Sequence, residues 1–256
     1  MPIGLRKVAI RVCNFPIALH FSQVLSIFTP NYNPLLMNIV NLSNGNSILH
    51  HFLAELRDVS IQQDPMRFRR NLERIGELMA YEISKTLVYE NIDVTTPLGI
   101  SSTPLMTHGV VLGTIFRAGL PMHGGMLNYF DHAENAFLSA YRYYKDKECE
   151  EVGIKIEYIA SPNLTGKMLI IADPMLATGG SMELGYEAFC TKGKPIHTHM
   201  ACVIASQAGV DYLRRVYGDR DDITLWCAAI DPYLNSHSYI VPGLGDAGDL
   251  AYGEKA

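Results

Sequence analysis

Four short apolar runs, separated by segments of helical character, constrain this chain more than any other feature of its sequence. They are GVVLGTIF (109–116), KMLIIA (167–172), THMACVIA (198–205) and ITLWCAAI (223–230). Strands that are apolar along their whole length are typical of a parallel sheet covered on both faces, because neither face meets water. The sequence therefore predicts an α/β fold, with a mostly parallel sheet flanked by helices.

The segment from residue 64 carries a clear helix signal. Asp64 suits an N-cap and Pro65 suits the first helical position. Apolar residues then recur three or four positions apart, which predicts one buried face and one charged, solvated face. The apolar positions are Phe68, Leu72, Ile75, Met79, Ile83 and Leu87.

Shorter segments complete the expected order of elements. Pro121 is expected to open a helix after the first apolar run. Residues 182–190 predict a short helix, and residues 206–218 predict a capped one. AFLSAYRYY (136–144) predicts a further strand, and the charged, then alternating residues 145–166 predict an exposed hairpin or arm.

Composition narrows the class of protein. The chain has 256 residues, of which 48% are hydrophobic and 18% charged, and its formal net charge is −5. This is enough apolar material for a sizeable core, and the mild acidity argues against a nucleic-acid partner, which usually requires a basic face.

Five cysteines without a C-x-x-C pair indicate reduced thiols in a cytoplasmic protein. No segment reaches the length of a membrane-spanning helix, so no membrane partner is expected.

The N-terminal segment does not continue this pattern. Basic residues precede an apolar patch between Phe15 and Phe28, as in a targeting peptide, but a proline interrupts the patch and no small-residue cleavage site follows. We interpret Met37 as the start of the natural protein. Residues 1–36 are then an extension outside the fold, and residues 37–256 form a single domain.

A glycine-rich segment near the C-terminus, GLGDAG (243–248), matches the G-x-G-x-x-G pattern of dinucleotide-binding proteins. That pattern needs a following helix, a further strand and an acidic residue about 20 positions on. Pro242 precedes the segment and only eight residues follow Gly248 in this 256-residue chain, so a dehydrogenase is disfavoured. The segment is either a glycine-rich turn or a loop whose backbone contacts a flat ligand.

A second glycine-rich segment, DPMLATGGS (173–181), joins an apolar run to a predicted helix. Glycines allow backbone N–H groups to converge on an anion, and the helix dipole and the Thr178 and Ser181 hydroxyls favour a terminal phosphate. The lysine of a Walker A loop is absent, which disfavours a nucleotide triphosphatase. Taken alone, the segment fits either a phosphate loop or a tight strand-to-helix turn.

Four segments together resemble one enzyme family. DPMLATGGS resembles the phosphoribosyl pyrophosphate (PRPP) loop of the uracil phosphoribosyltransferases, and YIVPGLGDAGD (239–249) resembles their uracil-binding segment. FRAGLPM (116–122) is similar to the family's LRAGLGM loop, and AYR (140–142) is similar to its MYR stretch. The resemblance extends from about Met37 to the end of the chain and keeps the family's order, with no counterpart for residues 1–36.

The resemblance implies a type I phosphoribosyltransferase fold, with a protruding β-arm and a C-terminal hood that binds the base. Arg117 and Arg142 would bind the pyrophosphate of PRPP, which suits arginine's fixed charge and forked donors. Asp246 would contact PRPP or its metal. The 5′-phosphate and ribose would lie against Asp173, Pro174, Met175, Leu176, Ala177, Thr178, Gly179, Gly180 and Ser181. Uracil would be bound by Ile240, Gly245, Asp246 and Ala247.

The implied reaction transfers the phosphoribosyl group of PRPP to N1 of uracil, giving UMP and pyrophosphate in pyrimidine salvage. The chain would then be a glycosyltransferase of the pentosyltransferase class. Positive charge builds on the ribose as pyrophosphate leaves, so stabilising the departing group is the expected source of catalysis. Mg²⁺ is the expected cofactor, carried by PRPP because no protein metal cage is visible. The family also implies GTP as an allosteric effector, and a homodimer or higher homo-oligomer formed through an arm.

Other functions stay open at this level. The same fold could serve a purine base or orotate, although base choice depends on the C-terminal segment, which resembles the uracil family. A phosphoribosyltransferase-like regulator of pyrimidine genes would bind RNA, and would need a basic face. The chain could also be an inactive paralogue, but such a protein would not need intact loops, and the loops are intact in this sequence.

Some residues depart from the family or from any clear pattern. DPYLNSHSY (231–239) replaces the more usual DEGLNEHGY, which bears on affinity and on allosteric control. His197 and His199 could face a metal from one side of a strand, but no third ligand is suggested, and a structural role is favoured. The spacing of His237 implies no chemistry.

Overall fold

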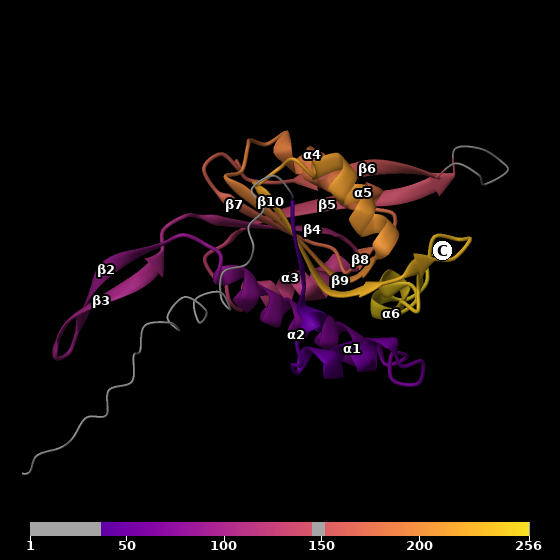
Figure 1. The fold of residues 1–256 in the computed structure, drawn as a ribbon, viewed down its shortest axis with the longest axis horizontal. Helices are drawn as coiled ribbons and strands as arrows, with labels where there is room; N and C mark the ends of the chain where they lie inside the picture. The colour runs from indigo at the N-terminus through magenta and orange to yellow at the C-terminus, as the bar shows by residue number, and fades with distance from the viewer. Residues whose placement is uncertain (1–36, 145–151, 256) are drawn as a thin grey trace, which may run out of the picture. The chain divides into compact units, whose positions relative to one another are not determined.

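An eight-stranded sheet forms the centre of the fold in a computed structural model of the chain, which describes residues 37–144 and 152–255 (Figure 1). Its strands are β1 (Asn38–Asn41), β4 (Val110–Phe116), β5 (Glu134–Tyr144), β6 (Val152–Ala160), β7 (Met168–Ala172), β8 (Met175–Leu176), β9 (His197–Ser206) and β10 (Ile223–Asp231). Seven of them follow the order β1-β10-β9-β7-β4-β5-β6, and β8 pairs with β9. Only the β5–β6 pair is antiparallel. The predicted α/β fold is confirmed, whereas the predicted extension 1–36 lies outside the described residues and stays a prediction.

Each buried strand divides its side chains between two apolar cores. In β7, Met168 and Ile170 belong to one core, while Leu169 and Ile171 belong to the other. Because both sides are covered, the strands are largely apolar, as their sequences predicted. The first core includes residues of α1 (Leu49–Arg57), α2 (Pro65–Ser84), α3 (Gly119–Leu127) and α6 (Ala247–Tyr252), and the second includes residues of α4 (Gly180–Cys190) and α5 (Gln207–Tyr217). Figure 1 shows α4 and α5 on one side of the sheet, with α1 and α2 on the other.

The four predicted helices, α2 to α5, begin within two residues of their predicted starts, whereas α1 and α6 were not predicted. The Asp64 carboxylate accepts the N–H groups of Met66 at 3.0 Å and Arg67 at 3.1 Å, and all six predicted apolar positions of this segment are buried. Helix α3 starts at Gly119, two residues before the predicted start. Pro121 fits there because a residue in the first helical turn has no intrahelical partner for its N–H. Among the described residues, no helix is both long and apolar enough to cross a membrane.

Parallel pairing aligns the ends of the central strands. Thr114 of β4 lies level with Ala172 of β7, and Ala172 lies level with Ala201 of β9. Asp231, the last residue of β10, lies level with Ser206 at the end of β9. The segments that follow β4, β7 and β10 therefore all leave from one edge of the sheet, which is the edge where open α/β sheets bind ligands.

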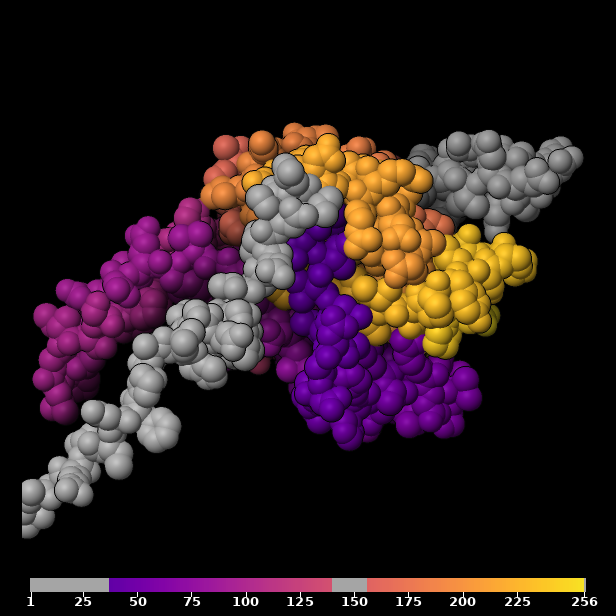
Figure 2. Space-filling model, in the orientation of Figure 1, coloured from indigo at the N-terminus to yellow at the C-terminus, as the bar shows by residue number. Residues whose placement is uncertain are grey.

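A separate hairpin, β2 (Tyr89–Thr96) and β3 (Gly99–Met106), was not predicted. Its strands pair only with each other, and every residue in them except Thr103 is exposed. Figure 2 shows the hairpin projecting from the other described elements. The sequence predicted an exposed hairpin or arm at residues 145–166, and the described part of that segment contains β6, which pairs antiparallel with β5 at the edge of the main sheet. Neither face of the β2–β3 hairpin is buried, so no regular alternation of apolar and polar residues marks it.

Helices α2 and α3 meet backbone to backbone through two glycines. A Cβ atom at Gly76 would lie 2.3 Å from the Met122 carbonyl oxygen, and one at Gly125 would lie 2.0 Å from the Glu73 carbonyl oxygen. Both distances are far shorter than any van der Waals contact, so this approach requires glycine. Because α3 directly follows Arg117 and Ala118, the contact also fixes where the loop after β4 leaves the sheet.

We predict that Gly125→Ala lowers the free energy of unfolding by about 2 kcal/mol, because the added methyl group forces the two helices apart. Gly124→Ala is the matched control on the same helix. Nothing lies within 4 Å of a Cβ at Gly124, so alanine's higher helix propensity should raise the free energy of unfolding by up to about 1 kcal/mol. Urea unfolding followed by circular dichroism measures both variants, and equal effects would contradict the assigned contact.

Candidate active site

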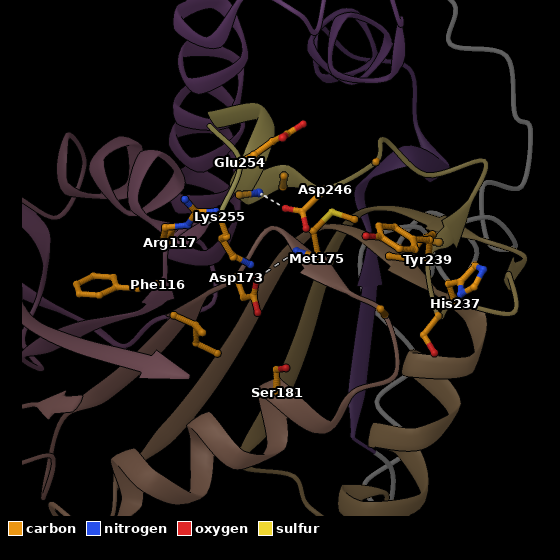
Figure 3. A pocket seen from close by; sticks show the side chains of 18 of the residues that line it. Phe116, Arg117, Asp173, Met175, Ser181, His237, Tyr239, Asp246, Glu254 and Lys255 are labelled. Atoms are coloured by element: carbon orange, nitrogen blue, oxygen red, sulfur yellow. Dashed lines mark hydrogen bonds between the residues drawn. The ribbon is translucent and has the colours of Figure 1, made fainter. Parts of the chain in front are cut away.

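The carboxyl-terminal ends of β4 and β7 open into a cavity of about 880 Å³ (Figure 3). Its described walls come from residues 115–118 at the end of β4, from residues between Asp173 and Ser181, and from residues between His237 and Lys255. In the view of Figure 3, Asp173 lies between Ser181 on one side and Asp246 on the other. The cavity therefore joins the two glycine-rich segments that the sequence analysis singled out.

The first part of the segment 173–181 is held rigidly from behind. The Pro174 carbonyl oxygen accepts the N–H groups of Val203 and Ile204, at 3.1 and 2.9 Å, and Met175 and Leu176 form β8 instead of the predicted loop. The Ser206 hydroxyl donates to the Ala177 carbonyl oxygen at 2.5 Å. A Cβ atom at Gly209 would lie 2.5 Å from that same oxygen, so the first turn of α5 packs directly on the segment.

The second part of this segment forms the start of α4. Gly179 has a φ of +92°, and a Cβ there would lie 2.6 Å from the Tyr212 ring, so both conformation and space require glycine. No side chain within the described residues caps α4. The N–H groups of its first turn have no intrahelical partners, and with the helix dipole they favour an anion. Ser181, in the first turn of α4, lines the cavity.

The C-terminal segment forms a rigid hook on the opposite side of the cavity, which we define as residues 240–249. Its first two residues, β12 (Ile240–Val241), pair with β11 (Tyr233–Leu234), and the Val241–Pro242 peptide bond is cis. Gly243 and Gly245 have φ values of +59° and +90°, which glycine adopts without strain. The Asp246 carboxylate accepts the N–H groups of Gly248 at 2.8 Å and Asp249 at 3.0 Å, and so caps α6.

A buried ion pair holds the turn of the hook. Arg57, at the end of α1, donates to both carboxylate oxygens of Asp231 at 2.7 and 2.8 Å, and to the Gly243 carbonyl oxygen at 2.9 Å. Asp231 also accepts the Gly243 N–H at 2.8 Å. The Asp231 side chain is 6% exposed and that of Arg57 is 25% exposed, so both polar groups of the Gly243 backbone are tied to one largely buried pair.

Arg117 lines the cavity at the end of β4 and contacts the C-terminal segment. It follows a cis peptide bond with Phe116, and its Nη2 donates to the Asp249 carboxylate at 2.7 Å. Its Nη1 donates to the Gly253 carbonyl oxygen at 3.1 Å. Its Nε is buried and has no partner among the described residues. The arginine is therefore oriented by the C-terminal segment.

Most of the predicted site residues meet at this cavity. Pro174, Leu176, Thr178, Gly179 and Gly180 do not line it themselves but belong to the same segment. Arg142 lies in β5 opposite Ile154, and its side chain lies outside the described residues. The roles of all these residues stay predictions. Those lining the cavity are Arg117, Asp173, Met175, Ala177, Ser181, Ile240, Gly245, Asp246 and Ala247.

Sequence reasoning missed a further set of lining residues. Ser139 lines the cavity because β5 places it level with Phe116 of β4, which no local pattern reveals. Ser238, with a φ of +62°, lies in the DPYLNSHSY stretch already noted as a departure from the family, so that departure was the available signal. The full missed set is Ile115, Phe116, Ala118, Ser139, His237, Ser238, Tyr239, Gly248, Glu254 and Lys255.

The histidine pair on β9 lies apart from the cavity. His199 Nδ1 accepts the indole N–H of Trp226 at 3.1 Å, and His197 Nε2 lies 3.0 Å from the Thr224 hydroxyl. Burial lowers the pKa of His199 to about 3, with a smaller contribution from His197, so the ring stays neutral. Within the described residues, no group of three histidine, cysteine or acidic side chains could hold a metal ion. These contacts support the structural role.

The fold and the site together define a class of protein. The chain has a parallel sheet with a glycine-rich, uncapped helix start after an inner strand, and a rigid C-terminal hook across the same cavity. This arrangement defines a type I phosphoribosyltransferase.

Comparison with known proteins gives the particular family. The sequence profile of the family "Uracil phosphoribosyltransferase" matches residues 43–254. A uracil phosphoribosyltransferase of Porphyromonas gingivalis is 60% identical over 219 residues, which cover 86% of this chain and 100% of that protein. One of Methanothermobacter thermautotrophicus is 39% identical over 211 residues, covering 81% of this chain and 93% of that protein. The solved structure of a protein from Aquifex aeolicus has a TM-score of 0.73 at 29% identity, and covers 84% of this chain and 98% of that one.

The chain belongs to the uracil phosphoribosyltransferase family, as its motifs predicted.

We predict that Asp231→Asn lowers the free energy of unfolding by about 3 kcal/mol, because it leaves Arg57 and the Gly243 backbone without their shared carboxylate. Asp211→Asn is the matched control, since Asp211 pairs with Arg214 at 3.4 Å on the exposed side of α5. Its effect should stay below about 0.5 kcal/mol. Thermal and urea unfolding measure both variants. An Asp231 variant as stable as the control would show that the pair does not hold the hook.

Proposed function

We propose that the chain converts uracil and PRPP to UMP and pyrophosphate, the reaction of pyrimidine salvage. One observation carries this proposal: the phosphate-type segment before α4 and the glycine-proline hook line the same cavity. A phosphate loop alone occurs in many kinds of enzyme, and a hook alone indicates no particular activity. Together they give the cavity one end that can bind a sugar phosphate and another that can bind a flat base.

The phosphate end offers backbone donors that no described side chain occupies. The 5′-phosphate of PRPP would accept the N–H groups at the start of α4 and the hydroxyls of Thr178 and Ser181. Asp173, at the carboxyl end of β7, would accept hydrogen bonds from the ribose hydroxyls. Because β8, Ser206 and Gly209 already hold the segment, little conformational freedom is lost when the phosphate binds.

The base end would recognise uracil through the backbone of the hook. The uracil edge presents a carbonyl, an N–H and a second carbonyl, and a fixed set of main-chain groups at Ile240 and at Gly245–Ala247 can match that order. Cytosine inverts part of the order and would leave buried polar groups unpaired, which is strongly penalised. The buried Arg57–Asp231 pair supports this role because it keeps the backbone of the hook in one conformation.

The chemical step breaks the bond between C1′ of the ribose and pyrophosphate and forms the bond from C1′ to N1 of uracil, and the N1 proton passes to the departing pyrophosphate or to water. Arg117 and Arg142 would bind the departing pyrophosphate, while the hook holds N1 in line with C1′. Mg²⁺ bound to PRPP would neutralise charge on the leaving group. Asp173, Asp246 and Glu254 line the cavity but form no metal-binding group within the described residues, so the ion would be held mainly by PRPP.

The experiment that tests the proposal incubates the full chain with PRPP, Mg²⁺ and each free base in turn, and follows nucleotide formation. We expect UMP with uracil and no product with cytosine, hypoxanthine or orotate. Omitting Mg²⁺ or adding a chelator should abolish the reaction. Product with hypoxanthine or orotate, or none with uracil, would contradict the assignment.

We also propose that the chain forms a homodimer or higher homo-oligomer through the β2–β3 hairpin. Leu98 is fully exposed and Ile100 is 73% exposed, and a two-stranded hairpin is marginally stable alone, so a second copy would both cover and stabilise it. Ile100→Asp should then shift the chain towards monomer in analytical ultracentrifugation. Ser101→Asp, which adds the same charge at the neighbouring exposed position, is the control. Equal oligomeric states for both variants and the wild type would argue against this surface.

Two further features complete the proposal. GTP is the proposed effector, and its addition at subsaturating PRPP should raise the rate of UMP formation. The site of action is proposed to be the cytoplasm. Cys190, Cys202 and Cys227, the cysteines of the described residues, are free thiols, which supports a reducing environment.

A further inference from the structure

Helix α6 reaches back from the hook to the arginine proposed for pyrophosphate. Asp249 lies in the first turn of α6, and its carboxylate accepts Arg117 Nη2 at 2.7 Å. The Gly253 carbonyl oxygen, just beyond the helix, accepts Nη1 at 3.1 Å. Both terminal nitrogens of Arg117 are therefore oriented by one short helix, although Arg117 itself follows β4.

The same helix is continuous with the base end of the cavity. Its N-cap is Asp246, and Ala247 and Gly248 line the cavity. A Cβ atom at Gly248 would lie 3.5 Å from Arg117 Nη2, so the helix backbone packs closely against the guanidinium. At the other end, Arg69 donates to the Ala251 carbonyl oxygen at 2.6 Å and ties α6 to α2. A shift of the hook must therefore also shift the groups that hold Arg117.

We propose that Asp249 is a positioning residue that holds Arg117 ready for the pyrophosphate of PRPP. This inference rests on the proposed function. A guanidinium has five N–H donors, and Asp249 and Gly253 account for two of them. The Nε–H is buried without a partner among the described residues, which costs free energy that a phosphate oxygen accepting this N–H would recover.

Asp249 is better suited to position the Arg117 side chain than to stabilise the fold. The Arg117 and Asp249 side chains are 34% and 33% exposed, and an ion pair so near solvent adds little to stability. The ion pair has a larger effect on the conformation of Arg117, because it fixes the plane and direction of a side chain with many rotamers. Removing the charge should therefore alter substrate binding while leaving the fold intact.

The test compares Asp249→Asn with the wild type in steady-state kinetics of UMP formation. We expect KM for PRPP to rise about tenfold, the cost of one weakened hydrogen bond to a charged group. At saturating PRPP, KM for uracil should change by less than about twofold, because the hook keeps its own contacts. Asp249→Glu keeps the carboxylate and should recover part of the loss, and the melting temperature of Asp249→Asn should equal that of the wild type.

Asp211→Asn serves as the matched control, because it removes a carboxylate from an exposed arginine pair that does not line the cavity, and its kinetics should equal those of the wild type. If Asp249 acts through Arg117, adding Asp249→Asn to Arg117→Ala should cause no further loss. A lower KM for PRPP in Asp249→Asn would mean that Asp249 competes with the substrate for Arg117, and would overturn the inference. An unchanged KM would overturn it too.

Calorimetric titration with PRPP and Mg²⁺ separates this inference from the proposed function. If the wild type makes no UMP, the proposed function fails. Weaker binding of PRPP to Asp249→Asn than to the wild type would still support the positioning role, whereas equal binding would refute it.

Discussion

Fold and site both depend on the parallel register of the central sheet. Because helices cover both faces, the inner strands are largely apolar, and groups that can reach a ligand gather where the strands end. Parallel pairing brings those ends to one edge, so the loops after β4 and β7 and the segment after β10 meet there. Arg117 and Asp249 lie 132 positions apart in the chain, yet this register places them 2.7 Å apart.

Both walls of the cavity are rigid because contacts outside the cavity hold them. Ser206 and Gly209 hold the phosphate segment, and Arg57 and Asp231 hold the hook, yet none of the four lines the cavity. Such supporting contacts reduce the reorganisation that substrate binding would otherwise require. Arg117 differs from these residues, since it lines the cavity itself and is held by Asp249 of the hook and by Gly253 beyond it.

The sequence predicted those features of the fold that neighbouring residues determine. Asp64 and Pro65 mark the start of α2, and four apolar runs mark the inner strands, while the residues of the site came from a resemblance to one family. Prediction failed where the deciding contact is remote. Met175 and Leu176 form β8 only because β9 offers them a partner, and Ser139 reaches the cavity only because β5 lies beside β4. The β2–β3 hairpin buries neither face, so the usual signal of a strand is absent.

The Arg57–Asp231 pair has a consequence for protein synthesis. Arg57 precedes Asp231 by 174 positions, and the Gly243 backbone joins the pair from still further along the chain. Domains fold during translation only as far as the ribosome has released them. Arg57 therefore leaves the ribosome long before Asp231 and Gly243, and a polypeptide terminated before Gly243 lacks the backbone that this pair holds.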